Sequence, residues 1–383
     1  MARRRAGETP MMSDERSLPA DGGRSAPSAL ALVRHYPGLT ALPRHALTSL
    51  PTPVASLERL ANRVALGPLW IKRDDVSGPL YGGNKPRKLE WLLGAARARG
   101  RRGVITFGGI GTHHGLATAL CARDAGMHCV LVMMPQPVTP HVQQCLRLHH
   151  ASGAEMHLAG SVAGIVATSL RRCGRAILAG EPLAIIPTGG TSATGAIGYV
   201  NAAFELADQI RAGALPEPAA IVVPLGSGGT VAGLMLGCRL AGLRSRIIGV
   251  LVTDILPPSG QRLARLARAT LGRLRALDDS LPEVQVTAQD LTIERHFLGA
   301  GYGAVTDAGS AAAELLVESE GVQLEPTYTA KAFAALLDLA ARAEWRGRPL
   351  LFWNTYSSVD PAAALSPLPE WRQLPAPFHR FFQ

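Results

Sequence analysis

The amino-acid sequence predicts an α/β protein with two lobes, each a mostly parallel sheet flanked by helices. The chain has 383 residues, 47% hydrophobic and 18% charged, which is too apolar for disorder and too long for one compact core. From residue 69 onwards, short apolar runs alternate with amphipathic stretches, as in strands joined by helices. No apolar run reaches the roughly 18–20 residues of a bilayer span, so we expect no transmembrane protein.

The elements follow in order along the chain. Residues 1–30 are polar and rich in Gly, Pro and Ser, and we expect a disordered leader there. A helix is expected over 88–100, because Gly100 suits the position just after a last helical turn. We assign 31–87 plus 196–383 to the larger, cofactor-binding lobe and 88–195 to the smaller lobe. Seven strands are expected, at 69–74, 104–109, 129–134, 184–187, 221–226, 247–253 and 349–355.

The formal net charge of +10 raises the question of a nucleic-acid partner. Only four of the 39 basic residues are lysines (Lys72, Lys85, Lys88 and Lys331), and the arginines are scattered through helical stretches. Aromatic residues make up 5% of the chain, too few for a surface on which bases stack. We therefore expect no nucleic-acid partner and no membrane partner. The five cysteines contain no CxxC pair, so we expect no disulfide scaffold, no metal and a cytoplasmic location.

Loops at the carboxyl ends of parallel strands are where such sheets bind ligands. Four of them have an unusual composition: 81–88 (YGGNKPRK), 107–115 (FGGIGTHHG), 187–196 (PTGGTSATGA) and 224–233 (PLGSGGTVAG). The last follows a strand and opens a helix, so its backbone N–H groups and the Ser227 and Thr230 hydroxyls suit a phosphate. It lacks the GK[ST] of a Walker loop, and Val231 replaces the third glycine of the dinucleotide fingerprint. The interpretations are a phosphorylated cofactor other than ATP or NAD, or a simple tight turn.

Lys85 follows Gly82, Gly83 and Asn84, and two glycines would let the backbone pass close to something flat or bulky. Lys88 lies one helical turn further on. A second cation and the loss of water would lower the pKa of the Lys85 amine and make it nucleophilic. A lysine amine with a phosphate loop is the minimal equipment for pyridoxal 5′-phosphate chemistry. The alternative is a solvated surface lysine.

Several segments, in order, resemble one enzyme family. IKRDD, GGNKPRKLEWL and ITFGGIGTHHGLATA are similar to the D-cysteine desulfhydrase and 1-aminocyclopropane-1-carboxylate (ACC) deaminase family. So are IPTGGTSATGAIGYVNAAFEL, GSGGTVAGL, GYGAVTDAG and VQLEPTYTAKAF, and the resemblance runs from about Pro51 to Ser358. It implies pyridoxal 5′-phosphate as cofactor, the two-lobed fold type II of the tryptophan-synthase-β class, and a homodimer.

The resemblance also implies roles for single residues. Lys85 would carry the cofactor covalently, with Asn84 beside it. Tyr302 and Tyr328 would line the substrate face, where one of them positions or protonates the leaving group. The phosphate would lie on Gly226, Ser227, Gly228, Gly229 and Thr230.

Two positions separate the members of this family. ACC deaminases carry Glu after the tyrosine of P-x-Y-E-G-K and Leu in a late H-L-G-G segment; here Thr329 and Thr355 stand in those places. A carboxylate by the pyridine nitrogen would keep it protonated and the ring a strong electron sink. A hydroxyl would leave the nitrogen closer to neutral, which is sufficient to eliminate a thiolate. The two threonines therefore favour elimination over ring opening.

One loop departs from the family pattern. Members read Q-S-N-[QH] where this chain has Gly111, Thr112, His113 and His114. Thr112 keeps a hydroxyl, and His113 can still donate an N–H but is bulkier and titratable. We expect Thr112, His113 and His114 to bind the substrate, with His113 also able to contact the cofactor's 3′-oxygen. The alternative is a polar helix start with no catalytic part.

The combined expectation is a pyridoxal-phosphate-dependent lyase similar to D-cysteine desulfhydrase. It would perform β-elimination on a small amino acid and release ammonia and a 2-oxo acid, with Lys85 removing the Cα proton. Three alternatives stay open. They are an ACC deaminase, a specialised enzyme with a sulfonate or biosynthetic substrate, and a non-catalytic or nucleic-acid-binding protein on the same scaffold.

Overall fold

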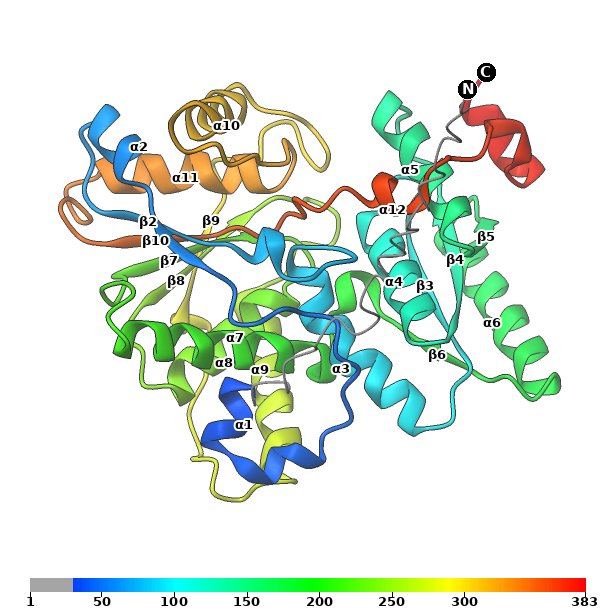
Figure 1. The fold of residues 1–383 in the computed structure, drawn as a ribbon, viewed down its shortest axis with the longest axis horizontal. Helices are drawn as coiled ribbons and strands as arrows, with labels where there is room; N and C mark the ends of the chain where they lie inside the picture. The colour runs from blue at the N-terminus through cyan, green and yellow to red at the C-terminus, as the bar shows by residue number, and fades with distance from the viewer. Residues whose placement is uncertain (1–29) are drawn as a thin grey trace, which may run out of the picture.

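The computed structural model describes residues 30–383 and contains two separate sheets (Figure 1). The larger sheet has the order β1-β2-β10-β7-β8-β9, and the smaller has the order β5-β4-β3-β6. All neighbouring strands are parallel except β1 and β2, which are antiparallel. This confirms the α/β class with parallel-rich sheets. The leader expected over 1–30 lies, apart from Leu30, outside the described residues.

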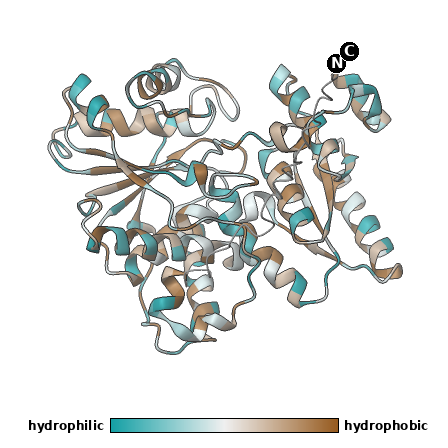
Figure 2. Cartoon of the chain, in the orientation of Figure 1, coloured by the Kyte–Doolittle hydropathy of each residue, from teal (hydrophilic) through white to brown (hydrophobic). Residues whose placement is uncertain are grey.

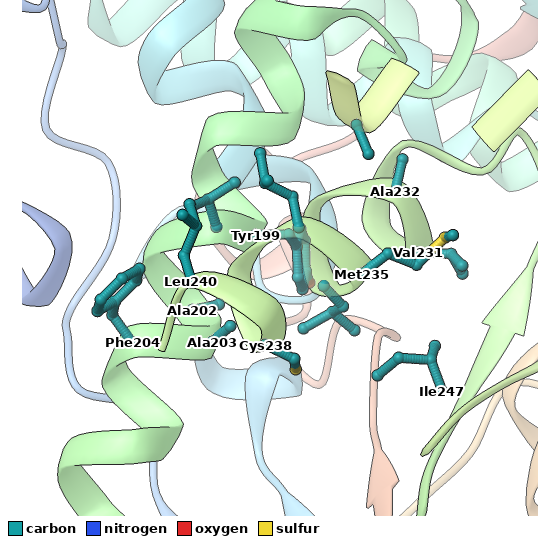
Figure 3. Packing of buried hydrophobic residues seen from close by; sticks show 14 of the residues in the cluster. Tyr199, Ala202, Ala203, Phe204, Val231, Ala232, Met235, Cys238, Leu240 and Ile247 are labelled. Atoms are coloured by element: carbon teal, nitrogen blue, oxygen red, sulfur yellow. The ribbon is translucent and has the colours of Figure 1, made fainter. Parts of the chain in front are cut away.

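The six-stranded sheet carries helices on both faces. Along β7, Ile221, Val223 and Leu225 pack against α1, α7, α8 and α9, whereas Ala220 and Val222 pack against α2, α10 and α11. This alternation follows from the two-residue period of a strand, and it explains why buried parallel strands read as continuous apolar runs. Figure 3 shows the packing of α7 on α8. The strands are β1 Val54–Ser56, β2 Leu69–Lys72, β7 Ala220–Leu225, β8 Arg246–Leu251, β9 Leu291–Glu294 and β10 Leu350–Trp353; the helices are α1 Ala31–His35, α2 Glu58–Arg63, α7 Ala193–Arg211, α8 Gly229–Leu240, α9 Gly260–Arg275, α10 Asp307–Glu320 and α11 Thr329–Ala341.

The four-stranded sheet packs α3, α4 and α5 against one face and α6 against the other. Hydrophobic residues run along its strands (Figure 2). Among the helices of residues 30–383, none is both long and apolar enough to span a bilayer. The strands are β3 Gly103–Gly109, β4 His128–Met134, β5 Glu155–Leu158 and β6 Leu183–Ile185; the helices are α3 Asn84–Ala98, α4 His113–Asp124, α5 Pro140–Ala151, α6 Val162–Leu178 and, near the carboxyl end, α12 Pro361–Leu365.

All seven expected strands are present, and β1, β5 and β9 were not expected. The helix expected over 88–100 begins earlier, at Asn84, and Gly100 with φ 69° follows its end. The division into lobes at 88 and 195 stays a prediction, with one difference at the carboxyl end. The apolar side chains of 361–383, assigned to the larger lobe, pack in the same cluster as α4 and α5, because the segment crosses to the smaller sheet.

A buried ionic network anchors the start of α3. Arg87 forms ion pairs with Asp74 and Glu205, and Lys72 pairs with Glu205 at 2.6 Å. Asp74 also accepts hydrogen bonds from the side chains of Thr52, Tyr199 and Trp353. Because each buried charge has a partner, the network fixes α3 against the larger sheet and thereby fixes the residues at its amino end.

Candidate active site at the amino end of helix α3

Loops from both sheets meet at the amino end of α3, which lies between the two sheets in Figure 1. Asn84 Nδ2 donates to Thr230 Oγ1 (3.1 Å) in the loop after β7, and Asn84 N donates to the carbonyl of Thr355 after β10. From the four-stranded side, His113 after β3 shares a hydrogen bond with the Tyr81 hydroxyl at 2.7 Å. The strand ends thus converge on Lys85, the second residue of α3.

Lys85 is half-buried, and no described residue forms a hydrogen bond or ion pair with its amine. Loss of water lowers the pKa of Lys85 to about 8, and the Glu325 carboxylate opposes this shift. A neutral fraction of this amine is therefore present near neutral pH, which a nucleophile needs. Partial burial makes Lys85 unlike a fully solvated surface lysine, and its role as the residue that holds a cofactor stays a prediction.

Lys88 is buried, and its charge does not lower the pKa of Lys85 as the sequence analysis expects. Burial first, and then the charge of Lys85, lower the pKa of Lys88 to about 7. The causes that lower the pKa of Lys85 do not include Lys88: desolvation lowers it, and the Glu325 carboxylate opposes the shift. The other two lysines have structural partners: Lys72 is in the ionic network, and Lys331 donates to the carbonyl of Leu298 at 2.6 Å.

At Gly82 and Gly83 the space that a Cβ would need is already occupied by other parts of the backbone. A Cβ at Gly82 would overlap the Asp75 carbonyl, and one at Gly83 would lie 2.5 Å from the Thr355 carbonyl oxygen. Gly83 also has φ 77°. The flat or bulky neighbour inferred from the sequence is therefore the chain itself, on the sides where those Cβ atoms would point.

The loop from Gly226 to Thr230 joins β7 to α8 and opens that helix. Ser227 Oγ accepts from Thr191 Oγ1 at 2.7 Å, which ties this loop to the glycine-rich loop after β6. Gly229 packs on Thr191, and Gly228 is left-handed with φ 91°. The first N–H groups of α8 have no helical partner, so the loop suits a phosphate as the sequence predicts.

Tyr302 and Tyr328 lie together at the mouth of this loop. The Tyr328 hydroxyl donates to the Tyr302 hydroxyl at 2.7 Å, and the rings meet edge to face at 5.9 Å. A Cβ on Gly226 would lie 3.5 Å from the Tyr328 ring, so Tyr328 lines the phosphate loop itself. Burial, together with the Tyr302 contact, raises the pKa of Tyr328. The Tyr328 hydroxyl therefore stays protonated.

The two threonines at the discriminating positions differ. Thr329 Oγ1 accepts from Glu325 N at 2.8 Å and donates to Glu325 O at 3.2 Å. The Thr355 side chain is buried, but its hydroxyl has no partner among residues 30–383. Only Thr355 therefore has a hydroxyl whose hydrogen bonds are left for a bound group.

Thr112, His113 and His114 form the start of α4. Thr112 Oγ1 accepts from Gly115 N and caps the helix. Burial and the charge of Lys85 lower the pKa of His113 to about 3, so its ring is neutral. His114 is buried, its Nε2 lies 3.0 Å from Thr106 Oγ1, and burial with the charges of Lys88 and Lys85 lowers its pKa to about 3. Its ring thus contacts strand β3.

The structure adds residues that the sequence reasoning missed. Glu325 influences Lys85, yet its carboxylate already accepts from Thr327 N and Tyr328 N. Tyr81 holds His113, and Tyr356 lies edge-on to the same ring at 6.4 Å. Glu325 lies within the segment VQLEPTYTAKAF that carries the family resemblance, so its position was a usable signal. No local sequence pattern pairs Tyr81 with His113.

Comparison with known proteins gives consistent relatives. The sequence pattern of the family described as "Pyridoxal-phosphate dependent enzyme" matches residues 46–355. D-cysteine desulfhydrase of Klebsiella pneumoniae (strain 342) is 33% identical over 335 residues, covering 83% of this chain and 94% of that protein. D-cysteine desulfhydrase of Salmonella choleraesuis (strain SC-B67) is 33% identical over 323 residues, with the same coverage. A solved structure of an ACC deaminase homologue superposes with a TM-score of 0.70 at 29% identity, covering 84% of this chain and 93% of that one.

Proposed function

This chain belongs to the family of pyridoxal-phosphate-dependent enzymes, with pyridoxal phosphate as its cofactor, and on that premise we propose that it catalyses β-elimination on a small amino acid such as D-cysteine. The products would be a thiol, ammonia and a 2-oxo acid. The observation that carries the proposal is the unpaired, half-buried amine of Lys85 beside the Gly226–Thr230 loop.

The residues present fit the cofactor. Asn84 Oδ1 and Asn354 Nδ2 are buried polar atoms with no partner among residues 30–383, so a polar ligand at this place would satisfy them. Lys85 would hold the cofactor covalently, Gly226 to Thr230 would hold its phosphate, and Thr355 would offer a hydroxyl to its ring. When bound, pyridoxal phosphate supplies an electron-withdrawing ring that stabilises negative charge on the carbon next to the amino group.

The chain's own groups would move the protons. With a pKa of about 8, Lys85 Nζ can take the Cα proton near neutral pH. The Tyr328 O–H donates a hydrogen bond to the Tyr302 oxygen, which leaves the Tyr302 O–H free to protonate a departing sulfur. Thr112 accepts in its capping bond, so its O–H can donate to a substrate carboxylate. His113 is neutral, and carboxylate binding therefore rests on hydroxyl and backbone N–H groups.

Elimination is favoured over ring opening because no free carboxylate stands at either discriminating position. Thr329 and Thr355 bear hydroxyls, and the oxygens of nearby Glu325 accept from backbone and Thr327 donors. ACC deaminase activity remains the second candidate, supported by the resemblance to the ACC deaminase homologue. A specialised substrate is the third, supported by the histidines that replace the usual loop.

The substrate test is incubation of the purified enzyme, loaded with pyridoxal phosphate, with D-cysteine, L-cysteine and ACC, followed by ammonia and 2-oxo acid assays. We expect pyruvate from D-cysteine and little 2-oxobutyrate from ACC. Tyr302→Phe should lower the rate with a poor leaving group more than with a good one. Efficient ACC turnover by the unmodified protein would overturn the assignment, and inactivity toward all three substrates would point to a specialised one.

The covalent link is tested separately from activity. Borohydride reduction followed by peptide mapping should place the pyridoxyl label on Lys85. Lys85→Ala should retain weak cofactor binding and lose the label, whereas Lys72→Arg should keep it. A label on Lys88 or Lys331 would refute the assignment.

We also propose that the enzyme is a cytoplasmic homodimer. All five cysteines are free, which fits a reducing compartment. Helix α6 buries none of its residues, and Val162, Val166, Leu170 and Leu178 are exposed on it, which supports an interface between copies. Light scattering at micromolar protein should give the dimer mass, and Leu170→Glu should shift it toward the monomer.

A further inference from the structure

Helix α5 lies beside the start of α4 and carries three residues of metal-binding type, two histidines and a cysteine, at four-residue intervals. His141, Cys145 and His149 therefore share one face of α5. His149 Nε2 is engaged by the Thr112 carbonyl at 3.0 Å and holds the turn that carries His113. His141 and Cys145 remain, and both face the His113 ring.

The distances within this group match those of a metal centre. His113 Nε2 lies 2.9 Å from His141 Nε2, His141 Nε2 lies 3.6 Å from Cys145 Sγ, and all three atoms are within 4.8 Å of one another. Zinc binds imidazole nitrogen at about 2.0–2.1 Å and thiolate at about 2.3 Å, so tetrahedral ligands are about 3.3 Å (N to N) and about 3.6 Å (N to S) apart. The Cys145 Sγ to His141 Nε2 distance already has the tetrahedral value, and the two imidazole nitrogens would have to move apart by about 0.4 Å.

The surroundings support the ligands. Tyr81 OH contacts His113 Nδ1 at 2.7 Å, which orients the ring and leaves Nε2 directed at His141, as outer partners do in zinc sites. The two imidazole rings stack at 5.0 Å with an angle of 20°. Cys145 is buried beneath them, whereas His141 is exposed and leaves the site open to solvent. A hydrogen bond between the two imidazoles would explain the 2.9 Å distance between their Nε2 atoms. It would not explain why Cys145 Sγ lies 3.6 Å from His141 Nε2.

We propose that His113, His141 and Cys145 form a site for a zinc-class divalent ion, with an open fourth position at the edge of the substrate site. Two imidazoles and one thiolate select borderline-soft ions such as Zn²⁺ or Co²⁺ over Mg²⁺ or Ca²⁺. On binding, the metal replaces the Cys145 thiol proton, which passes to solvent. The fourth position would take water or the sulfur or carboxylate oxygen of a small ligand. The proposal does not depend on which amino acid the enzyme uses.

The experiment is titration of chelator-treated holoenzyme with Co²⁺ and, separately, with Zn²⁺. We expect one ion per chain, the visible bands of tetrahedral cobalt and a thiolate-to-cobalt charge-transfer band. Cys145→Ser should abolish the charge-transfer band, and His141→Ala should weaken Zn²⁺ binding by at least about tenfold. Tyr81→Phe should weaken it less, because it removes only the partner of a ligand.

Matched controls separate this site from adventitious binding. His150→Ala changes a neighbouring histidine of α5, and Cys173→Ser changes a half-buried thiol of α6; both should bind as the unmodified protein does. His141 is exposed, so His141→Ala keeps the test valid if Cys145→Ser fails to fold. Equal Zn²⁺ affinity in His141→Ala, or cobalt spectra without a thiolate band, would overturn the proposal.

Discussion

Alanine substitutions at two glycines of the phosphate loop, Gly226 and Gly228, are expected to affect different properties: cofactor affinity at the first and folding stability at the second. A Cβ at Gly226 would make only ordinary contacts, 3.5 Å from the Tyr328 ring and 4.0 Å from Val252 Cγ2. A Cβ at Gly228 would overlap the Leu263 side chain, and its backbone has φ 91°. Gly226→Ala should therefore fold and bind pyridoxal phosphate weakly, whereas Gly228→Ala should lose stability.

The magnitudes follow from these contacts. An extra methyl group in a filled site costs about 1–3 kcal/mol, so Gly226→Ala should raise the cofactor Kd by about 5- to 150-fold. Its free energy of unfolding without cofactor should change by less than about 0.5 kcal/mol. In Gly228→Ala the left-handed backbone costs about 1–2 kcal/mol and the displaced Leu263 about 1–3 kcal/mol. Together they should lower the free energy of unfolding by about 2–5 kcal/mol.

The assay has two arms on the same cofactor-free preparations. Spectroscopic titration with pyridoxal phosphate gives the Kd, and urea unfolding without cofactor gives the free energy of unfolding. Unchanged affinity in Gly226→Ala would refute the placement of the phosphate on this loop. A Gly228→Ala protein as stable as the unmodified one would refute the argument from strain and overlap.

Three further predictions concern single groups. Because burial lowers the pKa of Lys85 to about 8 and the neutral amine attacks, covalent cofactor uptake should rise about tenfold per pH unit below about 8 and level off above it; a steady rise to pH 10 would contradict this. Asp74→Asn should lower the urea-measured free energy of unfolding by about 3–5 kcal/mol, because the buried Arg87 loses a charged partner; a smaller loss would mean that Glu205 alone is sufficient. Thr329→Val should cost about 1–3 kcal/mol of stability, whereas Thr355→Val should slow elimination with little loss of stability; equal profiles for the two variants would remove the distinction between these hydroxyls.

Local patterns were sufficient for the fold class and for the centre of the site. Apolar runs of five to seven residues between helical stretches predict β7, β8 and β10, because a strand buried on both faces needs continuous apolar residues. The short strands β1, β5 and β9 lack that signal, since each is three or four residues long and partly exposed. Lys85 was identified because a lysine-poor chain places it after Gly-Gly-Asn.

The sequence by itself therefore determined the class of fold, the glycine loop that suits a phosphate and the lysine beside it, since each depends on neighbours in the chain. Tertiary structure alone decided which groups are free. The fold gives the Thr329 hydroxyl hydrogen-bond partners and leaves the Thr355 hydroxyl without one among residues 30–383. It places Leu263 where a Cβ added to Gly228 would lie. It also brings His141 within 2.9 Å of His113. These outcomes depend on contacts between residues far apart in sequence, and burial there decides protonation: loss of water makes Lys85 partly neutral and His113 wholly so.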